Sequence, residues 1–253
     1  MNPLTTRVTH RTRLNTNWSI RSASITAGVG LLLMSALAGF GTFVAVEGLV
    51  TQGNAAQTAE DIVASEGLFR LGIASLFLVI ALDVAVAWAL YRVFSPVSKA
   101  ISLLAAWFRV VYAGVFMVAI SQLVGVLRLL GGDHYLAAFG ADQLHTQALL
   151  RINAFHSMWD AGMFLFGLHL IVIGYLAYRS GYVPRLLGVL LAVAGMGYLV
   201  DSLTPLLLPG IWSDVTSVTF IGEFLLALWL VIRGRRLTLN EAELHQDPIT
   251  AAR

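Results

Sequence analysis

The stretch AFHSMWDAGMFLFGLHL, Ala154–Leu170, is apolar over most of its length and yet holds His156, Asp160 and His169. It lies inside a longer apolar run that we expect to be helical from Ile152 to Tyr178. A bilayer core of about 30 Å needs about 20 helical residues at 1.5 Å each. The run is therefore long enough to cross a membrane. Its titratable groups then need partners inside the protein, because a charge at the centre of a membrane helix costs about 2.5–3.5 kcal/mol.

Further stretches of similar length and character occur on both sides of this one. They run approximately Ile25–Val46, Leu68–Tyr91, Ile101–Leu127, Leu186–Leu207 and Val215–Ile232. No strand-like alternation of apolar and polar residues recurs along the chain, so a helical bundle is favoured over a barrel. The sequence predicts an all-α fold, an integral membrane six-helix bundle.

The composition supports this prediction. Of 253 residues, 58% are hydrophobic and only 12% are charged, whereas an average soluble domain is about 25% charged. The chain has no cysteine, which excludes disulfides, thiolate metal sites and cysteine nucleophiles.

The positions of the basic residues predict the orientation of the bundle. Of the 16 basic residues, all but Arg70, Arg109, Arg128 and Arg151 fall in the segments that are cytoplasmic if the N-terminus is inside. Cytoplasmic segments carry an excess of Lys and Arg. We therefore expect both termini to be cytoplasmic and the protein to be a multi-pass protein of the bacterial inner (plasma) membrane.

The chain divides into one membrane domain and two polar tails. We expect residues 1–24 to form a mobile cytoplasmic tail, residues 25–236 the six-helix transmembrane domain, and residues 237–253 a second cytoplasmic tail. Between the spans, TAEDIVA predicts a short helix on the membrane surface, and the segment around Tyr135–Leu149 predicts a second amphipathic element. Pro205 and Pro209 indicate that the fifth span kinks or ends early.

Several motifs resemble those of one family of membrane proteins. They are SEGLFRLGI, GLHL, GYLAYRSGYVPRLLGVLL, GMGYLVDS and IGEFLLALWL. At these motifs the chain resembles the bacterial polytopic membrane proteins of the domain of unknown function 4386 family. The resemblance implies an integral membrane protein of about six helices and implies no activity. The charged and histidine positions that match are Glu66, Arg70, His169, Arg185, Asp201 and Glu223, and their roles are unassigned.

Counting residues from the inner helix ends places several polar groups at one depth. Asp83 and Arg109 lie on consecutive helices joined by a tight turn, each about 12–14 Å from the cytoplasmic edge, which predicts a buried ion pair. His169 and Glu223 fall in the same inner-to-middle layer. If Arg109 serves both carboxylates, one of them carries a proton, as in a proton relay or a ligand site.

A second polar layer is predicted nearer the outside. Glu66 and Arg70 are four residues apart and can pair along one helix face, as can His156 and Asp160. Asp201, with Tyr198 one turn earlier, lies near the outer end of its helix. We expect these outer groups to meet beneath the outer loops. Glycines 162, 167 and 174 allow close helix approach around the polar positions.

The function is left open between three hypotheses. The first is a small-ligand or lipid binding, transport-like module with a buried polar interior. The second is a membrane-embedded metal-dependent hydrolase, with His156, Asp160 and Asp201 as candidate ligands, although no established metal motif is present. The third is a structural or assembly protein, in which the polar pairs fix helix packing. The sequence specifies neither a cofactor nor a catalytic residue.

The expected partners follow from the membrane setting. Arginines clustered at the inner surface are typical of anchors for lipid headgroups and do not form a nucleic-acid patch. Membrane lipid is therefore an expected partner and nucleic acid is not. A homo-oligomer is a further possibility, because six helices are few for a transporter acting as one chain.

Overall fold

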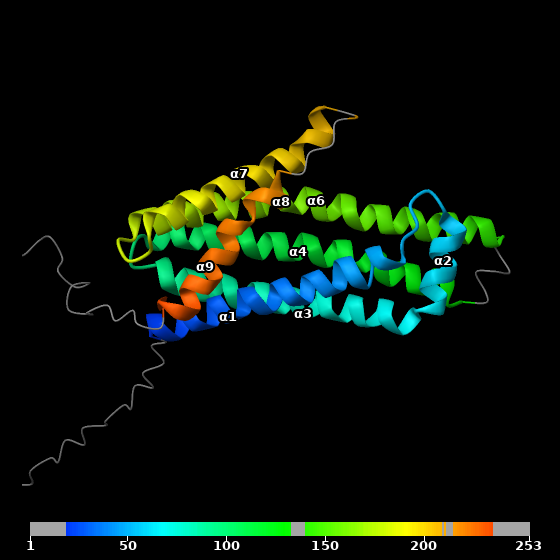
Figure 1. Cartoon of the computed structure of the whole chain (residues 1–253), viewed down its shortest axis with the longest axis horizontal. Coiled ribbons are helices and arrows are strands. Elements are labelled where there is room, and N and C mark those ends of the chain that lie inside the picture. Colours follow the sequence, from blue (N-terminus) through cyan, green and yellow to red (C-terminus); the bar gives the residue numbers. More distant parts are fainter. Residues whose placement is uncertain (1–18, 133–139, 209, 211–214, 235–253) are drawn as a thin grey trace, which may run out of the picture.

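A computed structural model shows an all-helical protein, as the sequence predicts (Figure 1). The structure describes residues 19–132, 140–208, 210 and 215–234. Five of its helices are long and apolar enough to cross a membrane. Residues 1–18 of the predicted first tail and the whole predicted second tail, residues 237–253, lie outside the described residues. The end of the first tail was predicted wrongly, because residues 20–24 already belong to the first long helix, which begins at Ile20.

The long helices run nearly side by side along the long axis of the molecule (Figure 1). They are α1 (Ile20–Gly39), α3 (Glu66–Phe94), α4 (Lys99–Leu130), α6 (Ala141–Arg179) and α7 (Arg185–Leu207). A π-helical turn, Phe40–Val44, extends α1, and a 3-10 turn follows at Glu47–Leu49. Helix α6 packs along both α4 and α7, and α1 packs on α3.

The sixth predicted span differs from the prediction. Residues in the region of Val215–Ile232 form two helices, α8 (Thr216–Thr219) and α9 (Ile221–Ile232), which meet at Phe220. Helix α9 has only 12 residues, fewer than the about 20 that cross a bilayer core. Gly222 at its start approaches the backbone of Leu190 in α7 so closely that a Cβ there would lie 2.8 Å from the Leu190 carbonyl oxygen.

Two other elements differ from the prediction in where they begin or end. The segment around Tyr135–Leu149 is not a separate amphipathic element where the structure describes it, because α6 begins at Ala141 and continues without a break through the predicted span. Residues 133–139 of that segment lie outside the described part. The fifth span includes Pro205 and ends at Leu207, as far as its predicted boundary, so Pro205 does not end α7 early. Pro209 lies outside the described residues.

The predicted short helix in the first outer loop is confirmed. It is α2 (Ala55–Ala64), which lies across one end of the bundle beside α6 (Figure 1). Asn54 starts it, since its side chain accepts a hydrogen bond from the Gln57 amide. Thr58 then ties the helix to the preceding turn by accepting from the Thr51 amide at 3.0 Å. The helix therefore covers the end of the bundle as a fixed element.

The described start and end of the chain meet at the opposite end of the bundle. Gly234 packs against Ser24, a buried residue near the start of α1. The inner turns of the chain lie at this same end, between α3 and α4 and between α6 and α7 (Figure 1). Basic side chains occur here at the helix ends: Arg21, Arg92, Lys99, Arg179, Arg185 and Arg233. We call this the basic end.

Helices α6 and α7 are held together through two facing pairs of glycines. A Cβ on Gly167 would lie 2.7 Å from the carbonyl oxygen of Gly195, and a Cβ on Gly174 would lie 2.6 Å from that of Gly188. Small residues let membrane helices approach closely, and packing is what holds such helices together in lipid. The close approach predicted at Gly167 and Gly174 is therefore confirmed.

Replacing Gly195 by alanine is expected to lower the free energy of unfolding by about 2 kcal/mol, because the added Cβ would lie 2.5 Å from the backbone oxygen of Gly167. Unfolding by SDS in mixed micelles, followed by circular dichroism, measures this effect. Gly114 is the matched control, since a Cβ there meets nothing within 4 Å. Gly114→Ala should leave stability unchanged or raise it by about 1 kcal/mol. Equal losses in the two variants would contradict the role given to the glycine pair.

Candidate functional site

A buried ion pair lies in the middle of the bundle. Nη2 of Arg109 in α4 lies 2.8 Å from Oδ1 of Asp83 in α3, and the two side chains are only 2% and 1% exposed. The predicted pair between these consecutive helices is confirmed. Its charges are withdrawn from solvent, so each depends on the other and on neighbouring polar groups for stabilisation.

His169 in α6 makes a further hydrogen bond with the guanidinium of Arg109. Its Nε2 lies 3.3 Å from Nη1 of Arg109, and its Nδ1 lies 2.8 Å from the carbonyl oxygen of Ala105. A carbonyl only accepts and a guanidinium only donates. The Nδ1 must therefore carry the hydrogen, and Nε2 accepts from Arg109. Because Ala105 is one turn before Arg109, the imidazole holds both the guanidinium and the turn of α4 that carries it.

Aromatic and sulfur groups enclose the rest of the guanidinium. Phe166, one turn before His169, presents its ring 5.3 Å from the Arg109 Cζ, a cation–π contact. The same ring contacts Tyr112 and Tyr198, with centroid separations of 5.0 and 5.2 Å. Nη2 of Arg109 also donates to the sulfur of Met34 in α1 at 3.8 Å. Arg109 thus links α1, α3, α4 and α6.

Glu223 reaches the same place from α9. It lines a cavity of about 10 Å³ together with Arg109, His169 and six apolar side chains from five helices. Its carboxylate accepts a hydrogen bond from the Tyr198 hydroxyl of α7. The predicted inner layer therefore does assemble. We call Asp83, Arg109, His169, Tyr198 and Glu223 the Arg109 centre.

The expectation that Arg109 serves both carboxylates is met only for Asp83. Within the described part of the chain, no ion pair joins Arg109 to Glu223. Two enclosed atoms, Nε of Arg109 and Oε1 of Glu223, have no hydrogen-bond partner among the described residues. A buried polar atom without a partner is costly. The two carboxylate oxygens of Asp83 also lack a hydrogen-bond partner in the part of the chain that the structure describes, but Asp83 does not line the cavity. The residues of the cavity wall therefore carry one unused donor, on Arg109, and one unused acceptor, on Glu223.

Only part of the predicted outer layer comes together. Arg70 donates through Nε to Oε1 of Glu66 at 2.7 Å, which confirms that pair, but the two side chains are 61% and 46% exposed at the start of α3. Between His156 and Asp160, both described, there is neither a hydrogen bond nor an ion pair. His156 packs edge-on against the ring of Phe155. His156 and Asp160 lie on the same helix, α6, and Asp160 interacts electrostatically with His156 and with Asp201 of α7. The pair of Glu66 and Arg70 is exposed at the start of α3 and takes no part in that group.

The contacts of Asp201 give it a structural role at the end of α7. Its two carboxylate oxygens accept hydrogen bonds from the backbone amides of Val215 and Thr216, at 3.0 and 2.8 Å. These amides begin α8, and a carboxylate at a helix start neutralises unpaired amides and the positive end of the helix dipole. Asp201 therefore fastens the chain after α7 to the outer part of that helix.

The proposed metal ligands do not form a metal site. The described residues contain no group of three or more His, Asp or Glu side chains that could hold a metal ion, and His156, Asp160 and Asp201 are no exception. Asp201 is instead bound to backbone amides. The candidate set for a metal-dependent hydrolase is thus wrong as a set of ligands.

Sequence reasoning missed the aromatic members of the site. Tyr112 accepts a hydrogen bond from Trp159 Nε1 at 3.1 Å, and Phe166 stacks on Arg109. The spacing of the residues could have indicated these two aromatic side chains. Tyr112 is three residues after Arg109 and Phe166 is three residues before His169, so each lies on the same helix face as its polar neighbour. Tyr198 was assigned to the outer layer beside Asp201, and it belongs to the Arg109 centre.

Helices long enough to cross a membrane and a charged centre enclosed between them define a multi-pass α-helical membrane protein. Within that class the chain belongs to the family described as domain of unknown function (DUF4386), whose model matches residues 26–234. An uncharacterised protein of Archaeoglobus fulgidus is 40% identical over 166 residues, which is 66% of this chain and 85% of that protein. No solved structure matches the chain.

Proposed function

We propose that this protein is a small-ligand binding, transport-like module of the cell membrane and that its ligand site is the Arg109 centre. The unused Nε of Arg109 and Oε1 of Glu223 beside one cavity carry this proposal. A centre that served packing alone would gain stability by satisfying both atoms. An unused donor and acceptor in an apolar interior are instead the groups that orient a ligand.

The chemistry of the cavity wall indicates a class of ligand. A hydroxyl group can accept from Arg109 Nε and donate to Glu223 Oε1 at the same time. The other lining side chains are Leu31, Leu90, Leu170, Ile173, Leu191 and Leu226. The ligand that fits this surface is small, with one hydroxyl or acid group on an apolar body, and a lipid fragment has this composition.

The volume of the cavity makes opening part of the proposal. About 10 Å³ is close to the minimum that holds one water molecule, so a larger ligand enters only if a helix moves. Helix α9 is the best suited to move. It is short, it meets α8 at a break, and it packs mainly on α1 and α7. Displacing α9 carries Glu223 away from Arg109.

The orientation in the membrane follows from the basic end. Cytoplasmic segments of membrane proteins carry the excess of arginine and lysine. This supports placing the basic end, with the described start and end of the chain, in the cytoplasm. Such an arrangement requires that α8 and α9 together return the chain across the bilayer after α7.

Single cysteines test whether the centre opens, since the chain has no cysteine of its own. Leu226→Cys places a thiol in the cavity wall on α9, where the native side chain is 2% exposed. In native membrane vesicles, a water-soluble methanethiosulfonate ethyltrimethylammonium reagent should modify this thiol, because opening admits water. Leu123→Cys is the control, equally buried but outside the cavity wall.

We expect Leu226→Cys to react at least about ten times faster than Leu123→Cys, a difference of about 1.4 kcal/mol in the free energy of exposing the two sites. Both variants must first elute as folded protein in size-exclusion chromatography. Equal rates, or no reaction at either thiol, would mean that the Arg109 centre only holds the helices together.

A further inference from the structure

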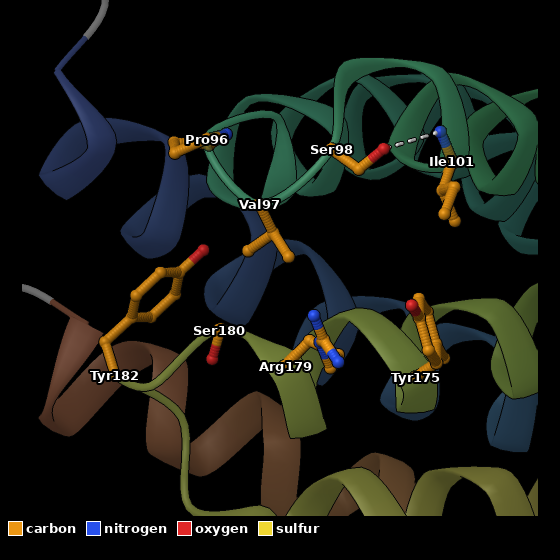
Figure 2. A pocket seen from close by; sticks show the side chains of 8 residues that line it. All are labelled: Pro96, Val97, Ser98, Ile101, Tyr175, Arg179, Ser180 and Tyr182. Atoms are coloured by element: carbon orange, nitrogen blue, oxygen red, sulfur yellow. Dashed lines mark hydrogen bonds between the residues drawn. The ribbon is translucent and has the colours of Figure 1, made fainter. Parts of the chain in front are cut away.

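A second pocket lies at the basic end, away from the Arg109 centre. It has a volume of about 370 Å³ and is formed between the α3–α4 turn, the last turn of α6 and the turn that follows α6 (Figure 2). Val97 and Ser98 line it on one side, and Tyr175, Arg179, Ser180 and Tyr182 on the other. Sites for small molecules have volumes of about 300–1,000 Å³.

Several polar side chains of the pocket wall make hydrogen bonds that stabilise the α3–α4 turn and the turn after α6. Ser98 accepts a hydrogen bond from the Ile101 amide at 3.4 Å and begins α4. Ser180 donates to the Ala177 carbonyl at 2.7 Å and accepts from the Val183 amide at 3.0 Å. These contacts give the pocket a defined shape before any ligand is present.

Tyr182 joins the two turns directly. Its hydroxyl donates to the carbonyl oxygen of Val93 at 2.6 Å, and its ring stacks on Phe94 with centroids 6.4 Å apart. Burial raises the pKa of the Tyr182 hydroxyl, so it remains a neutral donor in this contact. The wall formed by Tyr182 therefore does not change with pH in the physiological range.

Arg179 and Tyr175 differ from the other polar residues of the wall. Both side chains rise from α6 toward the α3–α4 turn and the start of α4 (Figure 2). Neither the guanidinium nor the Tyr175 hydroxyl has a hydrogen bond or ion pair with any residue that the structure describes. By contrast, the guanidinium of Arg185 lies 5.7 Å from the ring of Tyr178. The pocket therefore presents a free cation and a free hydroxyl.

We propose that this pocket binds the phosphate group of an anionic membrane lipid, with Arg179 as the main contact and Tyr175 as a second donor. A planar guanidinium binds phosphate oxygens through two parallel hydrogen bonds. The start of α4 adds backbone amides that the helix itself does not use, and its first turn holds no acidic residue. The site is separate from the Arg109 centre and goes beyond the proposed function.

The position of the pocket favours a lipid over a free anion. The basic side chains gather at this end of the bundle, at the level where lipid headgroups lie. Ile101 in the pocket wall continues along α4 to Leu103 and Leu104, which are each 48% exposed. Acyl chains can lie on this exposed apolar surface while the phosphate occupies the pocket. A volume of about 370 Å³ is also larger than a phosphate ion needs.

Native mass spectrometry of the full chain, released from detergent micelles and titrated with phosphatidylglycerol, tests the proposal. Arg179→Gln should weaken phosphatidylglycerol binding about tenfold, because charge-assisted hydrogen bonds are lost. Arg185→Gln is the matched control at the same end of the bundle, and it should change the affinity by less than about twofold. Equal weakening in both variants would show general attraction by the basic end and overturn the proposal, as would unchanged binding by Arg179→Gln.

Two further arms complete the test. Tyr175→Phe keeps the ring and removes one hydroxyl, and it should weaken binding about threefold. If Arg179→Gln does not fold, this variant decides, and unchanged affinity overturns the proposal. In the last arm, inorganic phosphate competes with phosphatidylglycerol. Displacement at equal concentrations would identify a site for free phosphate and overturn the assignment to a lipid.

Discussion

Replacing Asp83 by asparagine is expected to lower the free energy of unfolding by about 3–5 kcal/mol. The amide keeps the shape of the side chain but removes the charge that lies 2.8 Å from Arg109. Arg109 is only 2% exposed, so water cannot replace the lost carboxylate. His169 and Met34 remain in contact with the guanidinium, but neither carries a compensating negative charge. SDS unfolding in mixed micelles measures the loss.

A second substitution distinguishes the ion pair from a general packing defect. Asp83→Asn with Arg109→Gln leaves two neutral side chains facing each other, and most of the lost stability should return. The recovery can be complete, because Oδ2 of Asp83 has no hydrogen-bond partner among the described residues and the native pair is imperfectly compensated. A double variant as unstable as Asp83→Asn would contradict the pairing as the cause.

The exposed pair on α3 provides the matched control. Glu66 and Arg70 form an ion pair on one helix, with side chains 46% and 61% exposed. Exposed pairs contribute between about zero and 1 kcal/mol. Glu66→Gln should therefore cost less than about 1 kcal/mol in the same assay. A loss comparable with that of Asp83→Asn would mean that burial does not decide the importance of these pairs.

The depth of each polar group could be predicted from the sequence because a helix has a fixed rise per residue. Asp83 and Arg109 are similar numbers of residues from one tight turn, so they had to lie at one level. The same count placed His169 and Glu223 there, and both line the cavity beside Arg109. The inner layer could therefore be predicted by counting residues from the helix ends.

The direction of side chains along the helix was not available from such a count. Tyr198 and Asp201 lie on successive turns of α7 and were assigned to one layer. Long side chains on a helix lean toward its N-terminus, which in α7 is at the basic end. The Tyr198 hydroxyl therefore reaches inward to Glu223, while Asp201 binds amides at the start of α8. This second contact joins distant parts of the chain through a turn whose path the sequence does not specify.

The boundaries of the helices were predicted less well than the depth of their polar residues. No glycine or proline separates Ala141 from Ile152, and α6 is continuous there. The break at Phe220 has no such signal either, since the nearest glycine, Gly222, lies inside α9 and packs on α7. Tertiary packing, which outweighs local preference, sets both boundaries.

Replacing His169 by leucine is expected to lower the free energy of unfolding by about 3 kcal/mol, the second large effect. Leucine fills a similar volume, so the loss comes from hydrogen bonds. Nη1 of Arg109 loses its acceptor at 3.3 Å, and the Ala105 carbonyl loses its donor at 2.8 Å. A neutral buried group left without a partner costs about 1–3 kcal/mol and a charged one more. The Ala105 carbonyl still accepts within α4, so most of the cost falls on Arg109.

The control for His169 is on the same helix. His156→Leu makes the same chemical change at a half-buried site, where the ring packs against Phe155. It should cost less than about 1 kcal/mol, because no buried charge depends on it. In the background Asp83→Asn with Arg109→Gln, where no buried charge is left unpaired, His169→Leu should cost only about 1 kcal/mol, since no guanidinium then loses its acceptor. If His156→Leu were as harmful as His169→Leu, or if His169→Leu cost as much in that background as in the native protein, His169 would be holding the bundle by its volume and not by its contact with Arg109.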